Sequence, residues 1–378
     1  MLAQARTRLD KATIFSLKIL QYEHTSRYTD AIRTGRHGLA LFGISFPDLH
    51  EERQAALDAE LAAIETLQGE RTIEAFVELP TMQNVEMRTV MGLLSTLHTS
   101  CFLSGDKPLT LLNIATMVRL SLTHGNVEES AYAYVLYAAM LLGPIKEEYR
   151  AAYEFGLLAL RLNERLYNPA VRAKVCMMFA WAVSLWRMPL EASFPYTQEA
   201  FRFGHDTGLF VDASWALFNE LWFALLTSRD LAVFTTTYAP HVEYSERIKM
   251  HHIADAKRIL LQWGRALQGL TEHPLSFTDA TFDEAVYCRT YQGQRLFEMF
   301  HIVARLAILY TFEAYREARE AAQQAAIIIR NDFSGTIWDA LRTFYQALTL
   351  AALYAAATPA ERQATTSQLE VLCQRLQR

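Results

Sequence analysis

The sequence predicts an all-α fold: a superhelix, or solenoid, of stacked antiparallel helix pairs with degenerate repeats. Three observations support this prediction. Apolar residues recur at spacings of three and four in almost every window, as in Trp215, Phe218, Trp222 and Leu225. The 378 residues include only 15 Gly and 10 Pro, too few turn formers for an all-β fold of this length. A pattern of small residues at helical spacing also recurs three times.

Each copy of this pattern begins with a Tyr and has Ala or Gly three, seven and ten residues later. Steps of three and four keep the small residues on one side of a helix, where the absence of bulk lets the preceding antiparallel helix approach closely. We therefore expect each Tyr to begin the second helix of a pair. The three copies are Tyr28, Ala31, Gly35 and Gly38; Tyr149, Ala152, Gly156 and Ala159; and Tyr315, Ala318, Ala322 and Ala325.

A matching first helix precedes each copy, at 15–23, 134–142 and 300–310. Helix–turn–helix units of about 34 residues with small residues on the second helix resemble tetratricopeptide repeats. Degenerate pairs fill the long gaps between the copies; we expect 174–187 to pair with 194–204, and 212–226 with 231–244. Stacked pairs of this kind bury a continuous core and curve into a superhelix with a concave face.

The domain organisation follows from the lack of linkers. No Ser/Gly/Pro-rich run or long charge block interrupts the chain, so we expect one continuous helical-repeat domain over 1–378. The least repeat-like region is 269–294, which we interpret as an irregular loop with a short helix. It would join two sub-stacks, 1–268 and 295–378.

Composition narrows the choice of partner and compartment. A formal net charge of −5 gives no electrostatic reason to expect nucleic acid as a partner. The longest apolar stretches, 135–145 and 348–357, reach about half of the roughly 20 residues needed to cross a bilayer, so no membrane insertion is expected. The N-terminus has no apolar signal core, which favours a cytoplasmic location.

The four separate cysteines, Cys101, Cys176, Cys288 and Cys373, form no Cys-x-x-Cys pair and are interpreted as buried free thiols.

No catalytic motif is present. The sequence has no phosphate-binding loop, dinucleotide fingerprint, nucleophile elbow or zinc-protease motif, so we expect no catalytic residue, no cofactor and no enzyme activity. One polar cluster, at 241–258, leaves a metal site open as an alternative to a solvated helix face. Its ligands would be His241, Glu243, His251 and Asp255.

Aromatic residues are plentiful in the central third of the chain. At helical spacing they are expected mostly in the core, but some would line the concave face and grip a peptide or an apolar ligand. The groove candidates are Trp181, Trp186, Trp222 and Trp263.

Several short motifs also resemble a known class of protein region. "GISFP" follows the first helix pair, "LPTM" precedes a long helix, and "HGN" precedes "SAYAY". Together with the helix order they resemble the tetratricopeptide-like region of large bacterial signalling proteins. In those proteins the region follows protein-kinase-like and AAA-type ATPase domains and precedes a GAF domain with a sensor histidine kinase.

The resemblance implies a non-catalytic interaction and regulatory module within a longer signal-transduction protein. Its partners would be the adjoining ATPase, kinase-like and GAF/histidine kinase domains, or protein segments bound on the concave face. No catalytic residue of those domains has a counterpart here. Two alternatives remain open: a free-standing receptor or adaptor for a peptide or small ligand, and an α-helical metal protein or enzyme.

Overall fold

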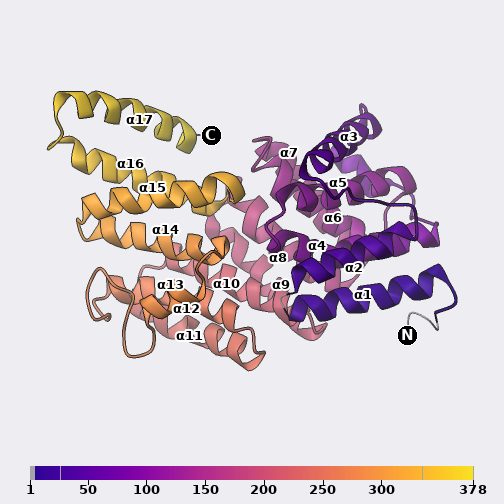
Figure 1. The fold of residues 1–378 in the computed structure, drawn as a ribbon, viewed down its shortest axis with the longest axis horizontal. Helices are drawn as coiled ribbons and strands as arrows, with labels where there is room; N and C mark the ends of the chain where they lie inside the picture. Colours follow the sequence, from indigo (N-terminus) through magenta and orange to yellow (C-terminus); the bar gives the residue numbers. More distant parts are fainter. Residues whose placement is uncertain (1–4, 26, 334, 378) are drawn as a thin grey trace. The chain divides into compact units, whose positions relative to one another are not determined.

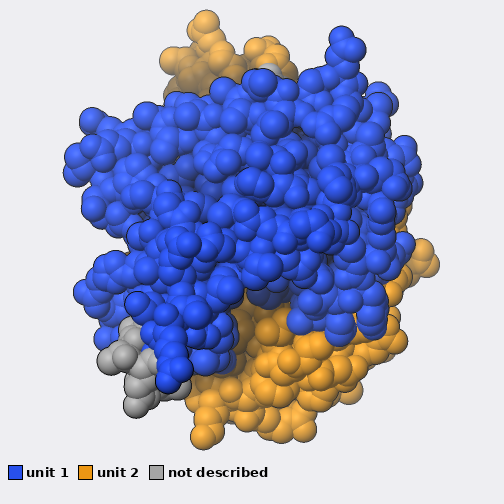
Figure 2. Space-filling view, turned by 90° about the vertical axis from the view of Figure 1, so that its right-hand side faces the viewer, with its two compact units in different colours: residues 1–187 blue, residues 188–378 orange. Residues whose placement is uncertain are grey.

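A computed structural model describes residues 5–25, 27–333 and 335–377, and confirms the all-α prediction. These residues contain no β-strand; their extended pairing is limited to the bridges Thr81–Asn126 and Asp279–Phe282. None of the helices in these ranges is long and apolar enough to cross a membrane. The chain divides into two compact units, Met1–Arg187 and Met188–Arg378, coloured separately in Figure 2.

The first unit arranges its helices in two rows. In the first row α1 contacts α4, α4 contacts α6, and α6 contacts α8. In the second row α2, α5 and α7 each pack against two neighbouring first-row helices. The bounds are α1 Arg8–His24, α2 Tyr28–Ala40, α3 His50–Gln68, η2 Ile73–Glu78, α4 Val85–Leu103, α5 Lys107–His124, α6 Glu128–Tyr137, η3 Ala138–Leu142, α7 Tyr149–Arg165, α8 Pro169–Met178, η4 Phe179–Val183 and η5 Ser184–Trp186.

Four further elements, α3, η2, η3 and η4, pack on or extend the helices of the two rows. The helix α3 packs on α5, and the 3₁₀ helix η2 packs on α7. The π-helical segments η3 and η4 continue α6 and α8 without a break, and such π turns often re-aim the side chains they carry. The predicted first helix at 134–142 therefore corresponds to the end of α6 together with η3.

The second unit repeats the two-row pattern. The helices α10, α12, α14 and α16 contact one another in succession, while α11 and α15 lie between neighbouring members of that row. Figure 1 shows α14, α15, α16 and α17 as consecutive layers. Connections of three or four residues make most consecutive helices antiparallel. The bounds are η6 Leu190–Ser193, α9 Phe194–Asp206, α10 Phe210–Thr227, α11 Leu231–Arg247, α12 His251–Leu267, α13 Glu284–Thr290, α14 Arg295–Thr311, α15 Tyr315–Asp332, α16 Ile337–Tyr354 and α17 Pro359–Gln377.

The helices α2, α7 and α15 begin at Tyr28, Tyr149 and Tyr315, and the nine small residues that follow these tyrosines are buried. Their packing partners differ in part from the expected ones. A Cβ added at Gly35 would lie 2.6 Å from Leu97 of α4, and one at Gly156 would lie 2.7 Å from Val183 of η4. These glycines therefore face the following first-row helix rather than the preceding one, because each second-row helix lies between two first-row helices.

The loops that carry two of the quoted motifs meet in space. The backbone N–H of Asn126 donates to the Pro80 carbonyl oxygen at 2.8 Å, and that of Met82 donates to the Asn126 carbonyl oxygen at 2.8 Å. The Asn126 amide nitrogen donates to the carbonyl oxygen of Phe76, and its amide oxygen accepts from the Tyr134 hydroxyl at 3.0 Å. We call residues 80–82 with 125–126 the loop clasp; it connects η2, α4 and α6.

The irregular segment at 269–294 contains the short helix α13 and lies inside the second unit. The boundary between the two compact units lies at Arg187 and Met188, just before Pro189, which has no N–H to continue the helical hydrogen bonding of η5. The expectation of one continuous domain over 1–378 stays a prediction.

Candidate functional site

The first-row helices of the first unit carry a connected set of polar and aromatic side chains. We call it the α4–α6–α8 face. In a two-row stack, the sides of the first-row helices that point away from the second row form one continuous surface. The face consists of Arg88, Gly92, His98 and Phe102 of α4, Glu128, Glu129 and Tyr132 of α6, Lys174 of α8 and Trp181 of η4.

One end of this face holds charged groups of both signs. The Arg88 guanidinium donates to the Glu128 carboxylate at 3.2 Å. Burial raises the pKa of the adjacent Glu129, and the charge of Glu128 adds to this; the charges of Arg88 and Lys174 act in the opposite direction. Gly92 leaves space beside Glu129, since a Cβ there would still lie 4.0 Å from Glu129 Oε1. The half-buried Glu129 is therefore a carboxylate that additional positive charge would stabilise.

The middle of the face is closed by two buried side chains, the His98 imidazole and the Tyr132 ring, with the Lys174 ammonium over that ring. Lys174 Nζ lies 5.2 Å from the centre of the Tyr132 ring, and His98 meets that ring edge-on at 5.7 Å. Burial, helped by the Lys174 charge, lowers the pKa of His98 to about 3, so this imidazole is neutral at physiological pH. Its Nδ1 is buried and has no hydrogen-bond partner within the described ranges.

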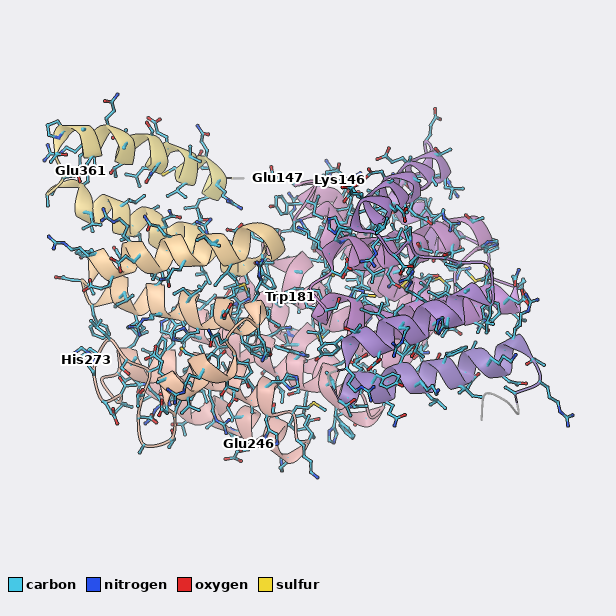
Figure 3. The ribbon with its side chains drawn as sticks, viewed as in Figure 1. Lys146, Glu147, Trp181, Glu246, His273 and Glu361 are labelled. Carbon is cyan, nitrogen blue, oxygen red and sulfur yellow. The ribbon has the colours of Figure 1, made fainter. Side chains whose placement is uncertain are left out.

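The other end of the face is aromatic. Trp181, labelled in Figure 3, is partly exposed and lies edge-on to Phe102 with ring centres 6.5 Å apart. It is carried by the π turn η4 rather than by the regular part of α8. Trp and Arg are enriched at protein-binding surfaces, and Trp181 and Arg88 lie at the two ends of this face.

The structure separates the four tryptophans proposed for a groove. Trp181 and Trp186 are partly exposed, and Trp186 packs on Tyr149 at 5.2 Å. Trp222 and Trp263 are 0% and 3% exposed, in the core of the second unit rather than on an open face. Trp222 stacks on Trp338 with ring centres 3.9 Å apart.

The proposed metal ligands have other roles. The His241 Nδ1 lies 3.3 Å from the Leu217 carbonyl oxygen, and Asp255 accepts from Arg258 at 2.6 Å and from the Tyr291 hydroxyl at 2.7 Å. Glu243 and His251 are exposed. Across the part of the chain that the structure describes, no group of three or more metal-ligand side chains comes together.

The second unit holds a buried amine, that of Lys257, which was not among the residues predicted from the sequence. Lys257 is 0% exposed, and its Nζ donates to Ser245 Oγ at 2.7 Å, to the His241 carbonyl oxygen at 3.0 Å and to Ser214 Oγ at 3.2 Å. Burial lowers the pKa of Lys257 to about 7. The signal was available, because Lys257 lies four residues after Ile253 and three before Leu260, within the apolar stripe of α12.

The cysteine prediction was wrong for two of four positions. Cys101 and Cys176 are buried, but Cys288 and Cys373 are exposed. Cys288 lies on α13, a seven-residue helix whose buried side is occupied by Tyr287. A short helix at the surface has few buried positions, so the general preference of free cysteine for the core does not apply there.

Comparisons with known proteins give no independent assignment. No known protein family matches the chain, and no curated protein matches it.

Proposed function

We propose that this chain is a non-catalytic protein-interaction and regulatory module of a bacterial signal-transduction protein. It would couple ATPase- or kinase-type domains to sensor domains through a concave surface of a tetratricopeptide-like superhelix. The observation that supports this most is the α4–α6–α8 face, which combines charges of both signs with a partly exposed Trp181 on successive helices.

The helix contacts support the superhelical part of the proposal. In each unit a second-row helix contacts two successive first-row helices, which is the contact pattern of a stacked repeat. Buried small residues on α2, α7 and α15 allow this close approach. The first-row helices would then line the concave side, where the α4–α6–α8 face lies.

The mechanism follows from differential affinity. A partner segment that prefers one curvature of the stack shifts the population toward that curvature by the difference between its two binding free energies. Repeat arrays suit this role because each helix pair contacts mainly its neighbours, so small changes at each interface accumulate along the array. Attached catalytic or sensor domains would respond to that change.

The first experiment is to read the source DNA on both sides of this segment and to express the flanking domains. Isothermal titration of the chain with each flanking domain tests for binding. We expect Lys174→Glu and Trp181→Ala each to raise the Kd by at least about ten-fold. Arg150→Glu on α7 and the exposed Tyr167→Ala are matched controls and should leave the Kd within about two-fold.

Two results would overturn the coupling proposal: stop codons at both ends, or no binding to any flanking domain. The free-standing receptor alternative predicts a ligand pocket lined by the central tryptophans. The burial of Trp222 and Trp263 in the core gives that alternative less support.

A further inference from the structure

A thiol, an imidazole and a carboxylate meet in the second unit, where α13 packs beside α14. Cys288 Sγ lies 3.7 Å from Nε2 and 3.9 Å from Nδ1 of His301. The same imidazole contacts Glu284 Oε1 through Nε2 at 2.7 Å. This is the order of groups that activates a thiol nucleophile: a sulfur beside an imidazole whose position a carboxylate fixes.

The sequence places the thiol and the carboxylate together. Glu284 and Cys288 are four residues apart on α13 and share one side of that helix. Asp283 caps the helix by accepting from the Val286 N–H at 2.9 Å, which fixes where α13 begins. His301 lies on the adjacent helix α14, so the cluster requires α13, which belongs to the irregular segment, to pack beside α14.

The carboxylate is held by four donors. Glu284 Oε1 accepts from His301 and from Arg305 Nη1 at 2.8 Å, and Oε2 accepts from the Phe277 N–H at 3.0 Å and from Ser276 Oγ at 3.3 Å. Burial alone would raise the pKa of Glu284, but the hydrogen bonds from His301 and Phe277 outweigh it and lower the pKa to about 2. Glu284 is therefore a fixed negative charge at every physiological pH.

This charge controls the imidazole. Burial alone would lower the pKa of His301, but its hydrogen bonds with Cys288 and Glu284 outweigh burial and raise the pKa to about 9. Both ring nitrogens then carry a proton at neutral pH: Nε2 donates to Glu284, and Nδ1 is the one that remains for the sulfur. The protonated imidazole therefore places a positive charge beside the Cys288 sulfur.

We propose that Cys288 is a modification site that undergoes thiol–disulfide exchange with low-molecular-weight disulfides, with His301 as a positioning residue held by Glu284. The Cys288 thiolate attacks one sulfur of the disulfide, and a new S–S bond forms as the original S–S bond breaks. The electron pair leaves on the second sulfur, which takes a proton from solvent. Cys288 ends as a mixed disulfide, and half of the reagent ends reduced as a free thiol. This inference does not rest on the function proposed above.

Exposure makes the site accessible and supplies an internal control. Cys288 is exposed, whereas Glu284 and His301 are nearly buried beneath it, with Phe277 and Tyr287 packed against the imidazole. Cys373 on α17 is also exposed and lies on another helix than this cluster. The irregular segment loops out beside α13 and α14, and His273 marks its outer turn (Figure 3).

The test is the rate of reaction of the full chain with 4,4′-dithiodipyridine between pH 5 and 9, with intact mass and peptide mapping to assign each phase. Titratable groups around the thiol are His301, Glu284, Arg305 and Tyr287. At pH 6 we expect Cys288 to react at least about ten-fold faster than Cys373. At pH 9 the two rates should converge, because His301, with a pKa of about 9, loses its proton there and no longer places a full positive charge beside the sulfur.

Variants separate the role of the imidazole from the exposure of the thiol. Cys288→Ser should remove the fast phase, and Cys373→Ser should remove only the slow one. His301→Asn should slow Cys288 by about ten-fold at pH 6 and leave the Cys373 phase unchanged. A Cys288 rate in the unmodified protein that rises with pH in parallel with the Cys373 rate would overturn the proposal, and this result does not depend on any variant folding.

Discussion

Lys257 shows how a single buried charge makes stability depend on pH. The three groups that accept from its Nζ are uncharged, so no carboxylate compensates for the removal of the ammonium from water. The pKa of this amine is about 7 in the folded chain and near 10.5 when it is exposed. Between these values the unfolded chain binds more protons, so folding stability rises with pH.

The Lys257→Met variant tests this account. The penalty for the buried cation is fully present below pH 7 and decreases as the pH rises through the interval from about 7 to 10. We expect the unfolding free energy of the unmodified protein to gain roughly 2 kcal/mol from pH 7 to 9 relative to the variant. Urea denaturation of both proteins at pH 6, 7, 8 and 9 measures this gain in unfolding free energy. Parallel pH profiles for the two proteins would contradict the assignment of the pH dependence to Lys257.

The buried Asn126 makes four hydrogen bonds. Its backbone pairs with Pro80 and Met82 in the loop clasp, and its side chain bonds Phe76 and Tyr134. Asn126→Ala leaves the Phe76 carbonyl oxygen and the Tyr134 hydroxyl without these partners in the interior. We expect a loss of about 3 kcal/mol, because each unpaired buried polar group costs about 1–3 kcal/mol. Asn84→Ala, which removes only the cap of α4, is the graded control and should cost about 1 kcal/mol. Equal losses in urea denaturation would show that the Asn126 side chain stabilises the fold no more than a helix cap does.

At the scale of the helix, Gly→Ala substitutions at two glycines in different surroundings should change the stability of the protein in opposite directions. A Cβ at Gly156 would lie 2.7 Å from Val183 and 2.8 Å from the Phe179 ring, and neither stiff side chain yields easily. Gly156→Ala should therefore destabilise the protein by about 1–2 kcal/mol despite the better helix propensity of Ala. Gly92→Ala, in the interior of α4 with free space around it, should stabilise by about 0.5–1 kcal/mol.

Thermal denaturation measures both glycine variants, and the sign of the difference between them is the decisive quantity. Gly35→Ala should fall between the two, because the atoms it would meet are the methyl ends of the flexible Leu97. A Gly156→Ala variant as stable as Gly92→Ala would show that α7 and η4 are packed less closely than the structure indicates.

The elements that the sequence predicts well are those with local signals. The starts of α2, α7 and α15 follow from a Tyr and three small residues at helical spacing, all within eleven positions. The helix that each glycine faces was not predictable in the same way, because the contacting residues are distant in the sequence. Leu97 lies 62 residues after Gly35, and Phe179 lies 23 residues after Gly156. Local periodicity identifies a face but does not identify its partner.

The polar sites were less predictable, for different reasons. "LPTM" and "HGN" were both recognised as motifs, but their pairing depends on the packing of α4, α5 and α6. Cys288 and His301 come together only because α13 packs beside α14. Lys257, in contrast, had a local signal, since its position in the apolar stripe of α12 indicates burial.

At the scale of the whole molecule, each compact unit contains buried aromatic clusters. Phe76, Tyr134 and Phe155 pack together in the first unit, and Trp222 with Trp338 in the second. We expect calorimetric unfolding in two transitions, because compact units of one chain commonly unfold as separate cooperative units. Asn126→Ala should lower the midpoint of one transition and Lys257→Met at pH 6 should raise that of the other. A single transition that both variants shift would contradict this expectation.

The loop clasp has a further consequence, for the exchange of backbone hydrogens with deuterium. Amides in loops usually exchange quickly, because they open by local fluctuation. The amides of Met82 and Asn126 lie in loops, yet each donates to the backbone of the opposite loop, which begins more than 40 positions away in the chain. Neither amide is released by fraying of a single helix end. Both should therefore exchange as slowly as amides in the middle of α4, and the first unit should open as one cooperative block from η2 to α6.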